Sequence, residues 1–299
     1  MQLPDLAGGD LTTCGPLDAG PLPDSPCAAS GIGARAPTGR LSVQTRTAFG
    51  SLNMTVMDDN GCRRVVVATD HPVGIPRWAP DHERLAYVTG GGTLHVIRVA
   101  RSGAVLCRAM WDLGGINATE LAWAADHELW LGTPTGLLRW RIGAGQVDQV
   151  NGLAVQRFDA IADGPLVVTT AGQVPPGSDL LWRPQVAGGM LNLLYSSPST
   201  IGPVRLSSDG KWAVYELSGV NLVQLDVAQP PEMSGMPGER SPAFALNDSA
   251  IVFTTDDGRL IFSSRDGKTD EVPPSWNAVY GPDWAPLPTP SCTPVTDCM

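Results

Sequence analysis

A motif that returns at a fixed spacing constrains the fold of this chain more than any other feature. Residues 77–81 read RWAPD, and a tight turn and three strand-sized apolar runs follow them. Equivalent anchor positions recur along the chain at Trp78, Trp123, Ala160, Leu206, Phe244 and Trp284. The 206 residues from 78 to 284 cover five intervals, a mean of about 41 residues. A repeat of this length predicts that each unit is one supersecondary element.

The runs between these anchors have the residue types of strands. Segments such as RLAYV, TLHVIRV and AVLCRAM are rich in apolar and β-branched residues, and Gly, Asp and Asn separate them at hairpin spacing. Helical periodicity is almost absent. Four strands in about 41 residues predict the four-stranded blade of a β-propeller.

The two ends of the repeated region complement each other. The residues before Trp78 predict three strands of a blade without an anchor strand, whereas an anchor strand around Trp284 has no blade after it. Completing one blade with strands from both ends leaves no open sheet edge. We therefore predict an all-β, six-bladed β-propeller of four-stranded antiparallel blades, closed by a C-terminal strand that completes the first blade. The expected boundaries are an N-terminal Pro/Gly-rich extension at 1–36, the propeller at 37–287 and a Pro/Thr/Cys tail at 288–299.

Units of the W-[SA]-P-D kind resemble the repeats of the TolB-like six-bladed β-propeller family, the WD-like PD40 repeats. The motif is complete at Trp78-Ala79-Pro80-Asp81, partial at 284–286 and 206–210, and degenerate around Ala160 and Phe244. The resemblance covers about residues 37–287. Such repeats occur in binding proteins, periplasmic scaffolds and domains attached to peptidases, so the resemblance implies a fold and not a chemistry.

The charge balance excludes one class of partner. The net charge is -10 and the pI is about 4.7, so binding to nucleic acid or to an anionic membrane surface would be repulsive. No apolar segment reaches the roughly 18 residues of a membrane-spanning helix.

The cysteines favour an oxidising compartment. Four of the six lie in the terminal segments, at Cys14, Cys27, Cys292 and Cys298. An even number of cysteines concentrated there predicts disulfides, as local pairs within each end or as a bridge between the ends. The other two, Cys62 and Cys107, are expected to be buried free thiols. We expect an exported bacterial protein, periplasmic or extracellular, whose signal peptide is absent from this chain; a cytoplasmic location is the alternative.

Catalytic and metal-binding motifs are absent from the sequence. It has no G-x-S-x-G segment, no C-x-x-C and no H-x-x-x-H, and only four histidines. His82 and His127 occupy the same turn in neighbouring units, which is typical of a repeat position. These patterns predict no metal, no cofactor and no enzymatic activity.

One pattern points to a candidate site at the channel mouth. The residues just before the anchors, starting from the closing strand, are Asp283, Arg77, Ala122, Asp159, Arg205 and Ala243, so Asp, Arg, Ala occurs twice around the ring. We expect Asp283/Arg77 and Asp159/Arg205 pairs. They are either structural ion pairs or a docking site, to which His71, in the loop before Pro72, would add a side chain.

These observations predict a non-enzymatic extracytoplasmic scaffold. It would bind a protein or peptide at one face, as a possible subunit of a larger cell-envelope or surface assembly. A small-ligand sensor is the first alternative, and an enzyme of the lyase or lactonase type with its site at the channel mouth is the second.

Overall fold

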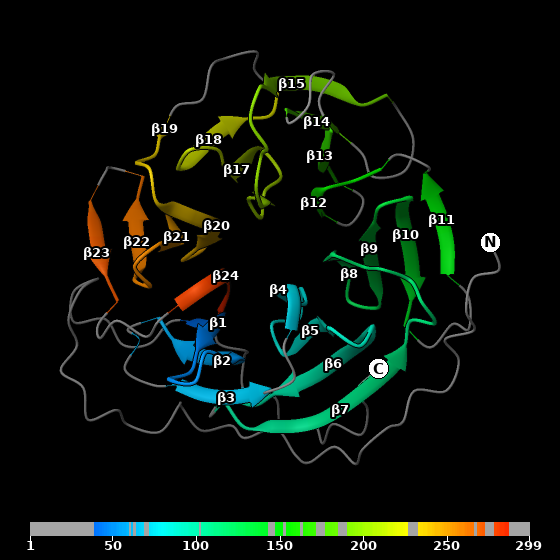
Figure 1. Cartoon of the computed structure of the whole chain (residues 1–299), viewed down its shortest axis with the longest axis vertical. Coiled ribbons are helices and arrows are strands. Elements are labelled where there is room, and N and C mark those ends of the chain that lie inside the picture. The colour runs from blue at the N-terminus through cyan, green and yellow to red at the C-terminus, as the bar shows by residue number, and fades with distance from the viewer. Residues whose placement is uncertain are drawn as a thin grey trace.

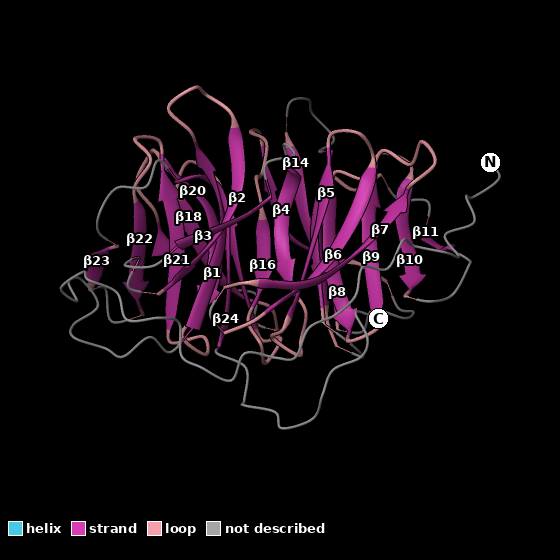
Figure 2. Cartoon of the chain, turned by 90° about the horizontal axis from the view of Figure 1, so that it is seen from below, coloured by secondary structure: helices cyan, strands magenta, loops and turns pink. Residues whose placement is uncertain are grey.

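A computed structural model gives the fold of the 299-residue chain. It describes residues 39–59, 61, 64–68, 72–101, 103–142, 147–151, 154–161, 164–171, 177–184, 190–226, 233–265, 268–272 and 278–286. The regular structure of these residues is entirely β, and no helix among them could span a membrane (Figure 2). Six four-stranded antiparallel sheets surround a central axis like the blades of a propeller (Figure 1).

The blades follow one another in chain order. The first is made of β24 (Ala278–Pro286), β1 (Gly39–Arg46), β2 (Leu52–Asp58) and β3 (Arg64–Ala68). The second is made of β4 (Pro72–Trp78), β5 (Arg84–Thr89), β6 (Thr93–Val99) and β7 (Val105–Asp112), and the third of β8 (Glu120–Ala125), β9 (Glu128–Thr133), β10 (Gly136–Arg141) and β11 (Val147–Asn151).

The second half of the ring repeats this arrangement. The fourth blade is made of β12 (Arg157–Ala160), β13 (Leu166–Ala171), β14 (Ser178–Arg183) and β15 (Asn192–Ser197). The fifth is made of β16 (Val204–Leu206), β17 (Trp212–Glu216), β18 (Val220–Gln224) and β19 (Met233–Ser234), and the sixth of β20 (Glu239–Ala245), β21 (Ala250–Thr255), β22 (Leu260–Ser264) and β23 (Thr269–Glu271).

Strand β24 closes the ring. It pairs antiparallel with β1, and Leu41 lies opposite Trp284 in the register. The first blade therefore combines its innermost strand from the C-terminal end of the repeats with three strands from the N-terminal end (Figure 1). This confirms the predicted closure and the count of six blades.

The predicted anchors all lie in the innermost strands. Each ends or nearly ends its strand, in β4, β8, β12, β16, β20 and β24. Asp81 explains the last letter of the W-A-P-D motif, because its Oδ1 accepts the backbone N–H groups of Glu83 and Arg84 at 2.9 and 3.1 Å. A turn carboxylate that accepts hydrogen bonds from the backbone of the residues just after it stabilises the turn to the next strand.

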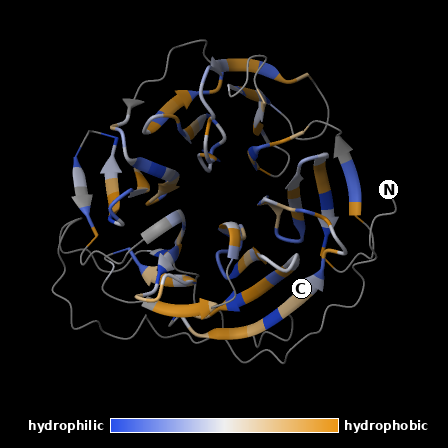
Figure 3. Cartoon of the chain, in the orientation of Figure 1, coloured by the Kyte–Doolittle hydropathy of each residue, from blue (hydrophilic) through white to orange (hydrophobic). Residues whose placement is uncertain are grey.

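The core is divided into six hydrophobic clusters, and each cluster fills the space between two adjacent blades. The cluster between the sixth and the first blade contains Leu41, Val43 and Val252, all without exposed surface. Apolar residues accordingly occur on the strands of every blade (Figure 3). Burying one such side chain stabilises the fold by about 1.5–3 kcal/mol. The interface made by β24 is thus a sixth core of the same kind as the other five.

One cysteine prediction is wrong. Cys107, in β7, is disulfide-bonded and is not a free thiol. A cysteine in a regular strand has the same sequence signature as a small apolar core residue, so the strand pattern does not reveal the disulfide. The terminal cysteines Cys14, Cys27, Cys292 and Cys298 lie outside the described residues, as does His71.

Candidate functional site

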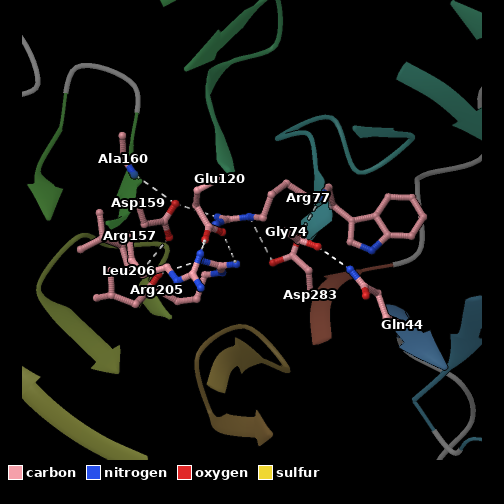
Figure 4. A network of polar contacts seen from close by, with 12 residues as sticks. Gln44, Gly74, Arg77, Glu120, Arg157, Asp159, Ala160, Arg205, Leu206 and Asp283 are labelled. Carbon is pink, nitrogen blue, oxygen red and sulfur yellow. Dashed lines mark hydrogen bonds and ion pairs between the residues drawn. The ribbon is translucent and has the colours of Figure 1, made fainter. Parts of the chain in front are cut away.

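The site is built on the innermost strands. The central channel has two ends. One end is surrounded by residues at or near the starts of β12, β16, β20 and β24, and the other by residues at the ends of these strands. A cavity of about 570 Å³, here called the polar mouth, lies at the first end. A cavity of about 460 Å³, here called the aromatic mouth, lies at the second. A network of charged side chains, shown in Figure 4, includes lining residues of both cavities.

Arg77 binds two of the predicted carboxylates. Its Nη2 lies 2.7 Å from Asp159 Oδ1, and its Nε lies 3.5 Å from Asp283 Oδ1. The expected pair with Asp283 is therefore present, and Arg77 also reaches from the second blade to the fourth (Figure 4). The equivalent position of the third blade is Ala122, whose short side chain leaves room for this contact.

Arg205 does not form its predicted ion pair with Asp159. Its Nη2 lies 3.3 Å from Glu120 Oε1, while Arg157 Nη1 lies 3.3 Å from Glu120 Oε2. The side chain of Glu120 has no exposed surface. A buried carboxylate on the third blade thus binds one arginine from each of the two blades that follow it.

The aspartates instead tie neighbouring blades through the backbone. Asp283 Oδ2 accepts the N–H of Trp78 at 2.7 Å, and Asp159 Oδ2 accepts the N–H of Leu206 at 2.9 Å. In both cases the aspartate before one anchor caps the anchor of the next blade. The repeated Asp, Arg, Ala order therefore reflects the same structural hydrogen bond, from an aspartate to the backbone of the next blade, at two places around the ring.

Burial and charge set the protonation of this network. The pKa of Asp283 is raised by burial, against the opposing charges of Arg77 and Arg205. Burial lowers the pKa of Arg205, and the nearby Arg77 charge lowers it further. For Arg77, burial lowers the pKa, but Asp159, Asp283 and Glu120 together outweigh it and the pKa is raised.

The network contains equal numbers of opposite charges. Three arginines (Arg77, Arg157, Arg205) face three acids (Glu120, Asp159, Asp283). Charged groups in the interior are tolerated when they are paired in this way. The network therefore fills the middle of the channel without net charge, with Arg157 on the side of the polar mouth and Arg77 and Arg205 on the side of the aromatic mouth.

The polar mouth contains a cation without an acidic partner. Arg46, the exposed last residue of β1, lines the cavity and makes no ion pair with any described residue. Arg157 lies in the same wall with its side chain 29% exposed. Tyr280 adds a phenol whose pKa is raised to about 12, first by burial and then by the charge of Glu120, so the hydroxyl stays protonated. These groups are all hydrogen-bond donors.

The acids that line the polar mouth already have partners. Arg240 forms ion pairs with Asp256 and, at 3.8 Å, with Glu216. Asp257 Oδ2 lies 2.8 Å from Arg259 Nε. The wall therefore offers paired acids and one unpaired guanidinium.

Sequence reasoning missed Glu120, Arg157, Arg46 and Tyr280. Glu120 and Arg157 each stand three residues before an anchor, on the same strand face as the residue directly before it, so the alternation of a strand could have identified them. Arg46 and Tyr280 carry no such signal, because they come from the ends of two different strands. Within the described part of the chain, no cluster of three His, Cys, Asp or Glu side chains could hold a metal ion.

The fold and its two mouths define a six-bladed β-propeller with a network of ion pairs in its channel. No protein-family model matches the chain, and no curated protein matches it. Among solved structures, it is similar to a calcium-binding protein, regucalcin, from Agrobacterium tumefaciens, with a TM-score of 0.50 and 16% identity over 69% of this chain and 76% of that one. It also matches dihydro-heme d1 dehydrogenase NirN in complex with DHE, with a TM-score of 0.43 and 14% identity over 87% of this chain and 57% of that one.

These comparisons correct the functional prediction. The solved structure that matches with a TM-score of 0.50 is a calcium-binding protein, and it is not described as a protein-binding scaffold. The prediction of a non-enzymatic scaffold is therefore wrong, and so is the exclusion of enzymes that went with it. Its error was to infer a role from the absence of known motifs, although one fold can serve both binding and catalysis. At these identities the likeness shows the fold alone.

Proposed function

We propose that this propeller binds a small polar molecule with a carboxylate group in the polar mouth. The observation that carries the proposal is the unpaired, exposed guanidinium of Arg46 at a cavity of about 570 Å³. A volume of this size lies in the range of small-molecule sites.

The neighbouring groups support a carboxylate over a cation. Glu120 holds Arg157 by one nitrogen at 3.3 Å, so that the rest of this guanidinium is free to face a ligand. Tyr280 can donate its hydroxyl hydrogen to the same group, because its raised pKa keeps the phenol neutral. Arginine binds carboxylates well because its planar donors match both oxygens.

Calorimetric titration with succinate, and with succinamide as the neutral analogue, tests the proposal. We expect succinate to bind, and Arg46→Gln to weaken it by about tenfold, or about 1.4 kcal/mol. Arg141→Gln is the matched control, because Arg141 is 64% exposed and lies outside the cavity. Failure of succinate to bind, or equal binding by Arg46→Gln, would refute the proposal. Mass spectrometry of the recovered carboxylate then distinguishes a binding protein from an enzyme that converts it.

We also infer that the repeats are of the TolB-like PD40 kind. The turn aspartates support this inference, since Asp209 accepts the N–H of Lys211 at 3.0 Å much as Asp81 accepts that of Glu83. Alignment of a diverse set of homologous sequences would test it. If most of these homologues had another residue in place of both Asp81 and Asp209, the inference would be contradicted.

Export is a further part of the proposal. The disulfide of Cys107 supports an oxidising compartment, because such bonds are rare in reducing ones. Cell fractionation of the native source, followed by detection with an antibody, would test this location. Recovery in the cytoplasmic fraction alone would overturn it.

A further inference from the structure

The aromatic mouth differs in chemistry from the polar mouth. It is a cavity of about 460 Å³ at the end of the channel where the innermost strands finish. Its walls include all four anchors that have aromatic rings, namely Trp78, Trp123, Phe244 and Trp284. Arg77 and Arg205 lie deeper in the same cavity. Apolar walls with a few polar groups at fixed positions are typical of small-molecule sites.

The aromatic walls are held rigidly. Trp78 lies under the guanidinium of Arg40 at 4.5 Å, and the indole N–H of Trp123 donates to the carbonyl of Arg77 at 2.9 Å. Phe244 is 92% buried within the cluster between the fifth and sixth blades. These rings therefore cannot turn easily, and they offer apolar edges at a fixed separation.

The floor of the cavity has donors that lack acceptors. Arg77 Nη1 and Arg205 Nε are buried and have no hydrogen-bond partner among the described residues. The carboxylates next to them are occupied, because Asp159 and Asp283 each bind Arg77 or a backbone N–H with both oxygens. A buried donor without an acceptor costs about 1–3 kcal/mol, and more when it is charged. Both arginines line the cavity, so an anion there can compensate their charge, although these two nitrogens themselves have almost no accessible surface.

We propose that the aromatic mouth binds a small aromatic carboxylate, with its ring among the anchor side chains and its carboxylate against Arg77 and Arg205. An anion is favoured over a neutral acceptor because the guanidinium of Arg205 is almost fully buried, with its side chain 2% exposed. Added negative charge stabilises a buried cation more strongly than a neutral dipole does. This site shares no lining residue with the polar mouth and does not rest on the function proposed for it.

A strained turn forms part of the wall. Leu246, Asn247 and Asp248 have φ values of 53, 53 and 64°, which non-glycine residues adopt rarely. Asp248 Oδ2 holds the turn against the neighbouring blade by accepting from the backbone N–H of Ser208 at 2.8 Å and from its Oγ. Ser208 is exposed and lines the cavity, so a bulky residue there obstructs the mouth without touching the charged floor.

Benzoate is the probe for this proposal. Its binding to the full chain is measured by ligand-observed NMR and by the fluorescence of the tryptophans, with acetate and benzyl alcohol as comparison compounds. We expect benzoate to bind at least about tenfold more tightly than either comparison compound, since only benzoate has both ring and charge. We also expect Ser208→Trp to lose this binding, whereas Ser199→Trp, an exposed control outside both cavities, keeps it.

Two outcomes separate this site from the polar mouth. If Arg46→Gln leaves benzoate binding unchanged, the aromatic carboxylate is bound independently of the polar mouth. If benzoate does not bind, or binds to the Ser208→Trp variant as to the wild type, the aromatic mouth holds water only and the proposal is overturned. Circular dichroism of Ser208→Trp verifies that the loss of binding occurs in a folded chain, and Phe244→Leu provides a second variant in the ring wall.

Discussion

The carboxylate of Asp283, on the closing strand, accepts the backbone N–H of Trp78 in the next blade at 2.7 Å, while its other oxygen lies 3.5 Å from Arg77 Nε. One side chain thus binds the closing strand to the second blade. We expect Asp283→Ala to lower the free energy of unfolding by about 3 kcal/mol, because it removes one of the two carboxylates that bind the buried Arg77 guanidinium and leaves the buried N–H of Trp78 without its acceptor. Urea denaturation measures this loss.

The control for Asp283→Ala is an aspartate in an exposed ion pair. Asp148 lies 2.9 Å from Arg139, and its side chain is 57% exposed. Asp148→Ala should cost less than about 1 kcal/mol, because water screens such a pair. Equal losses for the two variants would show that Asp283 does not hold the ring together.

The same aspartate predicts a pH dependence. Burial raises the pKa of Asp283 above its ordinary value of 3.8, although the charges of Arg77 and Arg205 oppose this. The folded chain then binds a proton at a higher pH than the unfolded chain does. The contribution of Asp283 to the free energy of unfolding therefore falls as the pH rises from 3.8 through the raised pKa.

Asp283→Asn does not titrate at this position and isolates the effect. The free energy of unfolding of the wild type minus that of Asp283→Asn should decrease with rising pH and become constant above the raised pKa. Urea titrations at a series of pH values measure it. An increase of this difference with pH would contradict the assigned direction.

The fold could be predicted because its determinants are local. Strand-forming runs and turn residues lie within a few positions of each anchor, so the spacing of Trp78 and its equivalents was enough to place six innermost strands. The closing strand followed from the need to leave no open sheet edge. Both the innermost strands and the closing strand could therefore be predicted from the order and spacing of residues along the chain.

The partners inside the channel could not be predicted in the same way. Glu120 and Arg205 are 85 residues apart and meet across the ring, so their contact depends on the width of the channel and on side-chain length. Arg46 faces the polar mouth only because β1 ends there. The repeat spacing of the sequence predicts neither the contact between Glu120 and Arg205 nor the position of Arg46 at the polar mouth.

Gly281, in the closing strand, has a left-handed backbone conformation and no room for a side chain. Its φ is +60°, and a Cβ added there would lie 2.4 Å from Ile75 Cγ1. Gly50 has a φ of +84° with nothing within 4 Å, so it is a matched control with similar backbone strain and no steric clash. We expect Gly50→Ala to cost about 1 kcal/mol and Gly281→Ala about 1–3 kcal/mol more, measured as free energies of unfolding. Equal costs would mean that β24 does not pack tightly against β4.

Glu120 is expected to be the most sensitive acid in the channel. Its side chain is completely buried and faces Arg157 and Arg205, each at 3.3 Å. Glu120→Gln removes the charge that compensates two guanidiniums and should lower the free energy of unfolding by about 3–5 kcal/mol. Glu271→Gln is the comparison, because Glu271 is 43% exposed and lies 3.7 Å from Arg259. A loss below about 1 kcal/mol for Glu120→Gln would show that water compensates the arginines instead.

The disulfide of Cys107 is expected to stabilise the folded chain. This cysteine lies in β7, the outermost strand of the second blade, where a covalent link restricts the unfolded chain. Cys107→Ala should lower the free energy of unfolding by about 2–4 kcal/mol, because it removes that restriction. Peptide mapping by mass spectrometry without reduction identifies the partner cysteine, and chemical denaturation of wild type and variant measures the loss. If Cys107 reacts with a thiol reagent in the unreduced, denatured protein, the bond is absent and the support for an oxidising compartment is lost with it.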